Sequence, residues 1–315
     1  MFVVADTFHI GRVYRKSLYR EYTDSTYTTL KPRPPQWEHL GFLGPLLRAQ
    51  VGDTIRVVFR NNTHHPATMH PHGVFYSKDS EGAPSADGTS GADKADDGVP
   101  PGGTHVYIWP VPERAGPAEH DPSSILWMYH SHADEDRDVN SGLMGPMIVS
   151  RRGTTRPDGT PQDVDRELIV SFHEMDENMS WHLEHNIATY TGKARKPEPM
   201  ELVFFHPFGL SNFKESMNGF LFGHLPGLTM RLGDRVRWYL MATTNFEVHA
   251  PHWHGNTVVI GGMRTDVASL QTMEMVVADM VVDNPGTWLF HCHVRDHLNA
   301  GMQAHYTVTT RAAGQ

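Results

Sequence analysis

The sequence contains a single cysteine, Cys292, among its 315 residues. One thiol cannot form a disulfide within the chain, so the cysteine count says nothing about the redox compartment. No apolar run approaches the roughly 18 residues that a helix needs to cross a bilayer, which predicts that nothing spans a membrane. The first residues also lack a basic stretch followed by a long apolar core. Either the protein is not exported by the route that reads such a leader, or the leader has already been removed.

Long basic runs and long helical periodicities are scarce as well. The formal net charge is −9 with a pI of about 6.2, which argues against a nucleic-acid partner. The 28 glycines and 22 prolines divide the chain into short segments. Alternating apolar and polar residues at 54–60 and 235–240 predict half-buried strands. We therefore expect an all-β protein made of antiparallel β-sandwiches.

The chain repeats itself. The segment 51–73 is similar to 232–255, and the segment 125–136 is similar to 287–297. This internal duplication predicts an N-terminal domain at residues 1–152 and a C-terminal domain at residues 166–315. The polar, turn-rich residues 153–165 are the expected linker.

The residues around Cys292 form an unusual donor set. His291 and His293 flank the cysteine, and His297 and Met302 follow it. Two imidazoles, a thiolate and a weak axial thioether suit a blue-copper centre. Side chains of neighbouring strand residues point to opposite faces, so the flanking histidines cannot bind the same metal as Cys292 and need another metal.

Four His-x-His pairs provide ligands for further metals. Their members are His70 and His72, His130 and His132, His252 and His254, and His291 and His293. Eight imidazoles around one pocket are too many for one metal and suitable for three. His249, three residues before His252, remains to complete the blue-copper set with Cys292, His297 and Met302.

The duplication tests this assignment within the sequence. Alignment of the halves places Ser131 opposite Cys292, Asp136 opposite His297 and Ala67 opposite His249. Met302 faces Ser141 without a gap, or Leu143 if two residues are inserted. The first domain therefore lacks the ligands for a blue-copper centre, while both halves keep their His-x-His pairs.

The four motifs and their order resemble those of the multicopper oxidases. The stretches ADGTSGADKADDGVPPGG, SMNGFLFGHLPGL and HCHVRDHLNAGM are most similar to the ceruloplasmin and hephaestin branch. The resemblance implies two Greek-key cupredoxin domains and four coppers per chain. It implies a type 1 copper on His249, Cys292, His297 and Met302, and a type 2 copper on His70 and His252. The type 3 pair would be bound by His72, His130, His132, His254, His291 and His293.

The resemblance also implies an activity. A multicopper oxidase couples one-electron oxidation of a donor to the four-electron reduction of O2 to water, and Cys292 would conduct the electrons. The donor is a phenol or aromatic amine, as in laccases, or Fe(II) or Cu(I). Asp97 resembles the family's acidic residue near the cluster, although an ordinary Asp-Gly turn explains it as well. A second acid of many relatives is replaced here by Arg295, and Asp296 is its neighbour.

Two domains do not easily bring both halves of a three-copper cluster together in one chain. We therefore expect a homotrimer with clusters between subunits. The resemblance slightly favours an extracytoplasmic location. A trimeric copper nitrite reductase is an alternative, but its blue-site cysteine lies in the first domain. A non-enzymatic copper-binding module is a second alternative, although such modules are expected to lose cluster histidines. Asp266, Glu274 and Asp296 are candidates for binding a metal-ion donor, or are ordinary surface charges.

Overall fold

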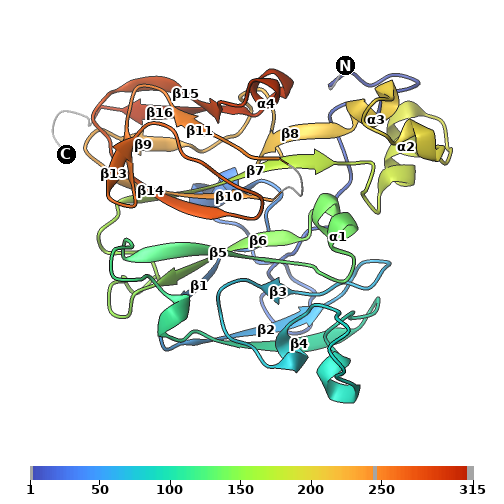
Figure 1. Cartoon of the computed structure of the whole chain (residues 1–315), viewed down its shortest axis with the longest axis horizontal. Helices are drawn as coiled ribbons and strands as arrows, with labels where there is room; N and C mark the ends of the chain where they lie inside the picture. Colours follow the sequence, from blue (N-terminus) through green and yellow to red (C-terminus); the bar gives the residue numbers. More distant parts are fainter. Residues whose placement is uncertain (1–2, 244–246, 311–315) are drawn as a thin grey trace.

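The computed structural model describes residues 3–243 and 247–310 as stacked β-sheets with a few short helices (Figure 1). Within this described part, the strands form four sheets. The prediction of an all-β fold with a duplicated sandwich is confirmed. No helix in the described ranges is long and apolar enough to cross a membrane.

In the first domain, a four-stranded sheet in the order β1-β6-β5-β3 faces the two-stranded sheet β2-β4. Its strands are β1 (Leu47–Gln50), β2 (Thr54–Arg60), β3 (His70–Pro71), β4 (Thr104–Pro110), β5 (Ser124–His130) and β6 (Met144–Ser150). Alternation along β4 builds the core, because Tyr107 and Trp109 are fully buried while Val106 and Ile108 are exposed.

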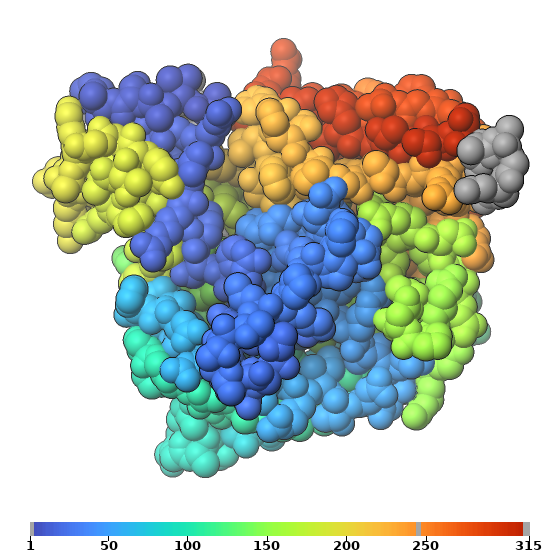
Figure 2. Space-filling view, turned by 180° about the vertical axis from the view of Figure 1, so that it is seen from behind, coloured from blue at the N-terminus to red at the C-terminus, as the bar shows by residue number. Residues whose placement is uncertain are grey.

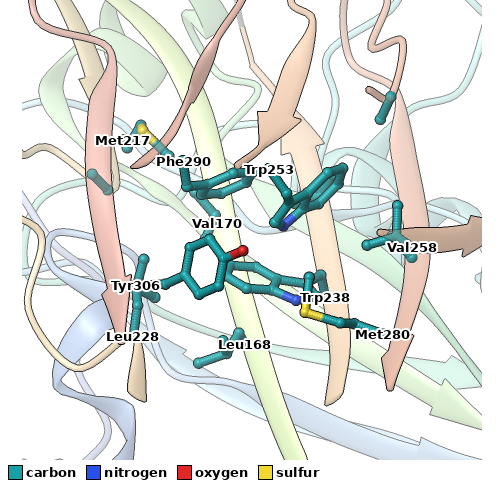
Figure 3. Close-up of a cluster of buried hydrophobic side chains, with 14 of the residues drawn as sticks. Leu168, Val170, Met217, Leu228, Trp238, Trp253, Val258, Met280, Phe290 and Tyr306 are labelled. Atoms are coloured by element: carbon teal, nitrogen blue, oxygen red, sulfur yellow. The ribbon is translucent and has the colours of Figure 1, made fainter. Parts of the chain in front are cut away.

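The second domain pairs a six-stranded sheet, β13-β12-β14-β10-β7-β8, with the four-stranded sheet β11-β15-β16-β9. Its strands are β7 (Arg166–Asp176), β8 (Phe213–Met217), β9 (Thr229–Arg231), β10 (Arg235–Ala242), β11 (Pro251–Trp253), β12 (Val258–Ile260), β13 (Met263–Thr265), β14 (Met275–Val281), β15 (Gly286–Cys292) and β16 (Gln303–Thr309). Aromatic rings from both sheets meet in its core (Figure 3). The Phe290 ring centroid lies 4.9 Å from Trp238 and 5.0 Å from Trp253.

The strand pairing confirms the internal duplication. Strand β1 runs parallel to β6, as β9 does to β16, and β2 pairs antiparallel with β4, as β10 does with β14. One difference remains. Strand β10 also pairs in parallel with β7, whereas β2 has no second neighbouring strand among the described residues.

The inner sheets of the two domains pack face to face. Met128 and Ile148 of the first domain share a buried cluster with Ile169, Tyr239 and Met241 of the second. Strand β6 ends at Ser150 and β7 begins at Arg166, with the linker that we predict at 153–165 between them. The division into domains at those residues stays a prediction.

The short helices lie at the edges of the sheets. They are α1 (Glu135–Ser141), α2 (Leu183–Thr191), α3 (Pro207–Ser211), α4 (Arg295–Ala300), and the 3-10 turns η1 (Pro35–Leu40), η2 (Lys78–Ser80), η3 (Gly91–Lys94), η4 (Glu113–Ala115) and η5 (Pro199–Glu201). The N-terminal segment first packs on the second domain, where Ile10 joins Leu183, Ile187 and Phe208. It then crosses the face of the first domain (Figure 2, dark blue).

Candidate metal centres

Three nitrogen and sulfur ligand atoms converge where β15 meets α4. Cys292 ends β15, His297 lies in α4, and His249 precedes β11. The His249 and His297 Nδ1 atoms are 3.2 Å apart, and Cys292 Sγ lies 3.9 Å from the first and 3.5 Å from the second. All three side chains are buried. The sequence prediction that His249 joins Cys292 and His297 therefore agrees with their placement.

These distances fit a metal ion bound in the plane of the three atoms. Metal bonds of about 2.0 Å to nitrogen and about 2.3 Å to a thiolate place trigonal ligands roughly 3.5–3.7 Å apart. Burial, with a smaller contribution from the neighbouring His297, lowers the pKa of His249 to about 3. His249 is therefore neutral, and its lone pair is available to a cation.

Backbone hydrogen bonds position Cys292 and its sulfur atom. The Ala250 N–H donates to Cys292 Sγ at 3.3 Å, and the Cys292 N–H donates to the Met302 carbonyl at 3.1 Å. Met302 is fully buried in the same cluster as Cys292. Burial raises the pKa of the Cys292 thiol, so a bound cation is needed to stabilise the thiolate.

The histidines on either side of Cys292 point away from this set. His291 and His293 have ring centroids 5.5 Å apart and lie 5.3 Å from the ring of His252. The His254 and His291 Nε2 atoms are 3.1 Å apart. We call His252, His254, His291 and His293 the second half-site. Strand alternation thus places Cys292 in the core and its neighbours on the other face.

Four histidines of the first domain form an equivalent group. The His72 and His130 Nε2 atoms are 3.1 Å apart, and the rings of His70 and His130 each lie about 5.5 Å from His132. We call His70, His72, His130 and His132 the first half-site. Burial lowers the pKa of His130 to about 3, so its lone pair is also available.

Backbone carbonyls orient four of these rings. The carbonyls accept hydrogen bonds from Nδ1 of His70, His130, His252 and His291, at 2.6, 3.1, 2.9 and 2.8 Å respectively. Because a carbonyl can only accept, Nδ1 carries the proton and Nε2 is left as the metal ligand. Two rings in each half-site are therefore preset for coordination.

The two half-sites do not meet within one chain. In the described ranges, no ring contact or hydrogen bond joins a histidine of one half-site to a histidine of the other. Strands β3 and β11 lie in different sheets, with the β7 and β10 sheet between them (Figure 1). His254 and His293 are exposed to solvent, so the second half-site has an open side.

The corresponding place in the first domain holds a polar network instead of metal ligands. The Ser131 hydroxyl donates to Asp138 at 2.6 Å, and Trp181 Nε1 donates to the same carboxylate at 2.9 Å. The alignment of Asp136 with His297 is wrong. Leu143 N–H donates to the Asp138 carbonyl as Met302 N–H donates to that of His297. The first domain has two extra residues between Ser131 and Leu143, which shift the alignment of the two halves. Asp138 is therefore the counterpart of His297, and Leu143 is the counterpart of Met302.

In the described ranges, neither Asp97 nor Asp296 forms a hydrogen bond or ion pair with a histidine of either half-site. Asp97 is half-buried and forms an ion pair with Lys94 at 3.0 Å, and Asp296 is exposed at the start of α4. The role of Asp97 stays a prediction. Glu135 was missed by the sequence reading, and its carboxylate lies 3.3 Å from His132 Nε2. Its position three residues after His132 on a helix start is the signal that could have found it.

A second acid behind the first half-site was also missed. Asp96 is fully buried, and its carboxylate accepts a hydrogen bond from the Gly82 N–H at 2.6 Å. Glu81, the residue before Gly82, supplies the carbonyl that orients His70. Asp96 therefore holds the loop that fixes the His70 ring.

Three further acids lie beside the Cys292 site. Glu174 of β7 is opposite Glu215 of β8 in the strand register, and β8 contacts α4, which carries His297. A carboxylate oxygen of Glu247 lies 3.6 Å from His297 Nε2. Burial, reinforced by their neighbours' charges, raises the pKa of Glu174 to about 7 and that of Glu215 to about 8. We call Glu174, Glu215 and Glu247 the acidic cluster.

Two of the acids that the sequence suggests for a metal-ion donor make local contacts. The Glu274 carboxylate accepts the Gln271 N–H at 2.7 Å and so closes a local turn. Asp266 supplies the carbonyl that orients His252. The role that we predict for Asp266, Glu274 and Asp296 in binding a metal-ion donor stays a prediction.

A duplicated β-sandwich with a buried thiolate between two histidine sets defines a copper-binding protein of the cupredoxin type. Models of the multicopper oxidase family match residues 39–154 and 195–312. The chain belongs to the multicopper oxidase family.

Named relatives lie in one branch of that family. The chain is 48% identical to rat hephaestin over 302 residues, 44% identical to mouse ferroxidase HEPHL1 over 301 residues, and 40% identical to human ceruloplasmin over 300 residues. Each alignment covers 95% of this chain but only 25% to 27% of the relative. The chain thus spans about a quarter of the length of the relatives it matches.

Solved structures support the same fold. A crystal structure of a multicopper oxidase superposes with a TM-score of 0.58 at 21% identity, covering 84% of this chain and 78% of that one. The blue copper oxidase from Nitrosomonas europaea also gives a TM-score of 0.58, at 22% identity, covering 85% and 76% of the two chains. The predicted cupredoxin fold is therefore confirmed.

Proposed function

We propose that this protein is an oxidase that takes single electrons from a donor and passes them through Cys292 to O2. One observation carries the proposal: the Cys292 sulfur faces His249 and His297, while its backbone neighbours His291 and His293 face the second half-site. Bound copper would supply the redox chemistry, with a type 1 centre passing one electron at a time and three further coppers supporting four-electron reduction of O2 to water.

We assign the ligands as follows. The type 1 copper would be held by His249, Cys292, His297 and Met302, the type 2 copper by His70 and His252, and the type 3 pair by His72, His130, His132, His254, His291 and His293. The protein's contribution is preorganisation. Carbonyl acceptors fix the orientations of four rings, burial keeps His249 and His130 neutral, and the Ala250 N–H stabilises the thiolate.

We propose that the electron donor is a reduced metal ion, with Fe(II) preferred over Cu(I). The acidic cluster offers carboxylates next to His297, the residue through which an electron would reach Cys292. Oxygen ligands suit a hard divalent cation better than a phenol or aromatic amine. The relative named ferroxidase HEPHL1 is in keeping with this donor class.

The half-sites become a complete cluster when three copies of the two-domain unit form a ring. We propose a homotrimer in which the first half-site of one subunit faces the second half-site of the next. The open side of the second half-site, where His254 and His293 are exposed, supports this arrangement. The resemblance to ceruloplasmin also favours a location outside the cytoplasm.

The oxidase proposal is tested with copper-loaded protein and its Cys292→Ser variant. The parent should show the intense visible absorption of a thiolate-bound copper and oxidise about four ferrous ions per O2 consumed. The variant should lose the absorption and at least about 1000-fold in oxygen uptake, since the electron path is removed. Full turnover in the variant would reject the proposal.

Subunit mixing tests the shared cluster. One variant loses the first half-site (His130→Ala and His132→Ala), and the other loses the second (His291→Ala and His293→Ala). Each is inactive alone. Co-assembled at equal amounts, they should recover about a quarter of the parent activity, because each site draws one half from each neighbour. No recovery in confirmed mixed trimers would show that the cluster is not shared.

Two alternatives are less well supported. A copper nitrite reductase would need its blue-site cysteine in the first domain, where Ser131 donates to Asp138 instead. A non-enzymatic copper-binding module does not require eight cluster histidines, four of them oriented by backbone carbonyls. Copper binding without oxygen uptake would favour that module.

A further inference from the structure

A groove of about 950 Å³ opens in the first domain beside β2. One wall is β2, and the other is the N-terminal segment at residues 15–22. Its floor is apolar, with Tyr19, Phe59, Tyr129 and Leu143 among the lining residues. We call this feature the strand groove. It lies on the face where the N-terminal segment crosses the first domain (Figure 2).

The second domain shows what fills the corresponding space. There β7 lies between β10 and β8, and it pairs in parallel with β10 from Val236↔Arg166 to Ala242↔Phe172. Strand β2 is the counterpart of β10, and residues 15–22 line the side of the groove opposite β2. The first domain therefore has a groove beside β2 where the second domain has β7, and no strand among its described residues fills it.

The open edge of β2 carries backbone groups that can pair with a strand. Val111 N–H donates to the Asp53 carbonyl, and Asn61 N–H donates to the Gly103 carbonyl. Both bonds continue the β2–β4 register and involve the odd-numbered residues that flank β2. In an antiparallel pair the bonding direction alternates, so the backbone groups of the odd-numbered residues of β2 bond to β4. Alternation then directs the N–H and C=O groups of Arg56, Val58 and Arg60 into the groove. The Val58 carbonyl accepts a hydrogen bond from the Tyr27 hydroxyl at 3.1 Å.

Two apolar residues of β2 are less buried than their counterparts on β10, as expected where a neighbouring strand is absent. Ile55 and Val57 on the inner face of β2 are only half-buried, whereas their counterparts Val236 and Trp238 on β10 are fully buried. Apolar residues of a sandwich interior stay accessible only where the layer above them is incomplete.

The rim of the groove indicates the charge of the occupant. Arg15, Arg20, Arg56 and Arg60 are exposed along it, against two acids, Glu21 and Asp24. The other lining cations, Lys16 and Arg48, form ion pairs with Glu177 and Glu167. An inserted strand with acidic residues on its outer face would therefore match the rim.

We propose that the strand groove binds an extended peptide segment, parallel to β2, whose apolar residues face inward and alternate with acidic residues. The segment comes from outside these 315 residues. The undescribed stretches, 1–2, 244–246 and 311–315, are shorter than the seven-residue β2 that a strand would have to pair along. This is strand addition to an exposed sheet edge, in which backbone hydrogen bonds give affinity and side-chain pockets give specificity.

A peptide with the β7 sequence provides the probe. In the labelled peptide Arg166–Asp176, the outer-face residues Ile169, Ser171 and His173 are replaced by Glu, and a matched peptide carries Lys there. Fluorescence anisotropy measures binding, and hydrogen–deuterium exchange follows residues 54–60. The acidic peptide should bind saturably and slow exchange there by at least about tenfold, and the Lys peptide should bind at least about tenfold more weakly.

Two protein variants complete the experiment. Val58→Pro removes an N–H on the open edge without breaking the ladder to β4, and it should abolish binding, while Val58→Thr should bind as the parent does. If Val58→Pro unfolds, the pair Arg56→Glu and Arg60→Glu should reverse the peptide preference instead. Absent protection of residues 54–60, unchanged binding by Val58→Pro, or an unreversed preference would overturn the proposal. Protection that grows with protein concentration alone would assign the groove to a second copy and overturn it as well.

Discussion

Ser131 in the first domain occupies the backbone position that Cys292 occupies in the second. The Ser131 N–H donates to the Leu143 carbonyl at 3.0 Å, and the Cys292 N–H donates to the Met302 carbonyl at 3.1 Å. The Ser131 hydroxyl accepts the Thr68 N–H as the Cys292 sulfur accepts the Ala250 N–H. One backbone frame therefore carries a metal-ligand set in one domain and a hydrogen-bond network in the other.

The network in the first domain should contribute strongly to stability. Asp138 is fully buried and accepts hydrogen bonds from Ser131, from the Trp181 indole of the second domain, and from the Asp134 N–H. Asp138→Asn presents an amide N–H2 to these donors and should lower the free energy of unfolding by roughly 3 kcal/mol. Denaturant unfolding measures the loss. Asp136→Asn, at an exposed residue on the same helix, should stay within about 0.5 kcal/mol of the parent.

Stability should decrease in acid partly through His39. Its Nε2 accepts the Ile169 N–H at 3.2 Å, and burial lowers its pKa from 6.5 to about 3. Between those pH values the unfolded chain binds a proton that the folded chain excludes, so stability is lost as pH falls from 6.5 towards 3. The loss should approach roughly 4 kcal/mol.

His39→Gln keeps an acceptor for Ile169 but cannot titrate. Denaturant unfolding of both proteins between pH 7 and pH 4 in the same metal state should show a shallower acid limb for the variant. Other buried histidines contribute equally to both curves, so the difference isolates His39. Identical slopes would contradict the assignment.

The acidic cluster should distinguish metal-ion donors from organic ones. Glu215→Gln removes a buried carboxyl group near the Cys292 site, and the KM for ferrous iron should rise at least about tenfold because the variant lacks a ligand that a bound cation would hold as the carboxylate. The KM for a dimethoxyphenol should stay within about twofold. Steady-state oxygen uptake with each donor measures the two KM values. Glu174→Gln removes the carboxyl group opposite Glu215 and is compared in the same assay. An equal effect on both donors would point to a structural role.

The sequence suggests the candidate metal ligands through short motifs that recur along the chain, and their assignment to individual metals stays a prediction. A cysteine between two histidines on a strand predicts, without tertiary information, that the sulfur and the imidazoles face opposite sides. The acidic cluster could not be found this way. Glu174 and Glu215 meet only through the register of β7 with β8, and Glu247 comes from a third segment.

Two other features depended on details that sequence similarity does not encode. The two-residue insertion near α1 moved the counterpart of His297 from Asp136 to Asp138, and only the backbone hydrogen bonds reveal it. The strand groove is visible only when the neighbours of β2 are compared with those of β10.

The glycines that follow the first His-x-His pair of each domain, Gly73 and Gly255, should not tolerate a side chain, and the cause is the same at both positions. Gly255 has φ +74, and a Cβ there would lie 2.3 Å from the Trp288 ring, just as a Cβ at Gly73 (φ +79) would lie 2.2 Å from Trp127. Gly255→Ala should lower the free energy of unfolding by roughly 3 kcal/mol, combining backbone strain with the clash. It should also weaken copper binding, because His254 is the preceding residue.

Gly261→Ala separates the two contributions. Gly261 has φ +55, but a Cβ there meets nothing within 4 Å, so this variant should lose only about 1 kcal/mol from backbone strain. Thermal unfolding and copper content of the two variants give the comparison. Equal losses would show that the tryptophan contact is unimportant. A larger loss at Gly255, together with reduced copper, would show that the indole and the glycine jointly fix the turn that presents His254.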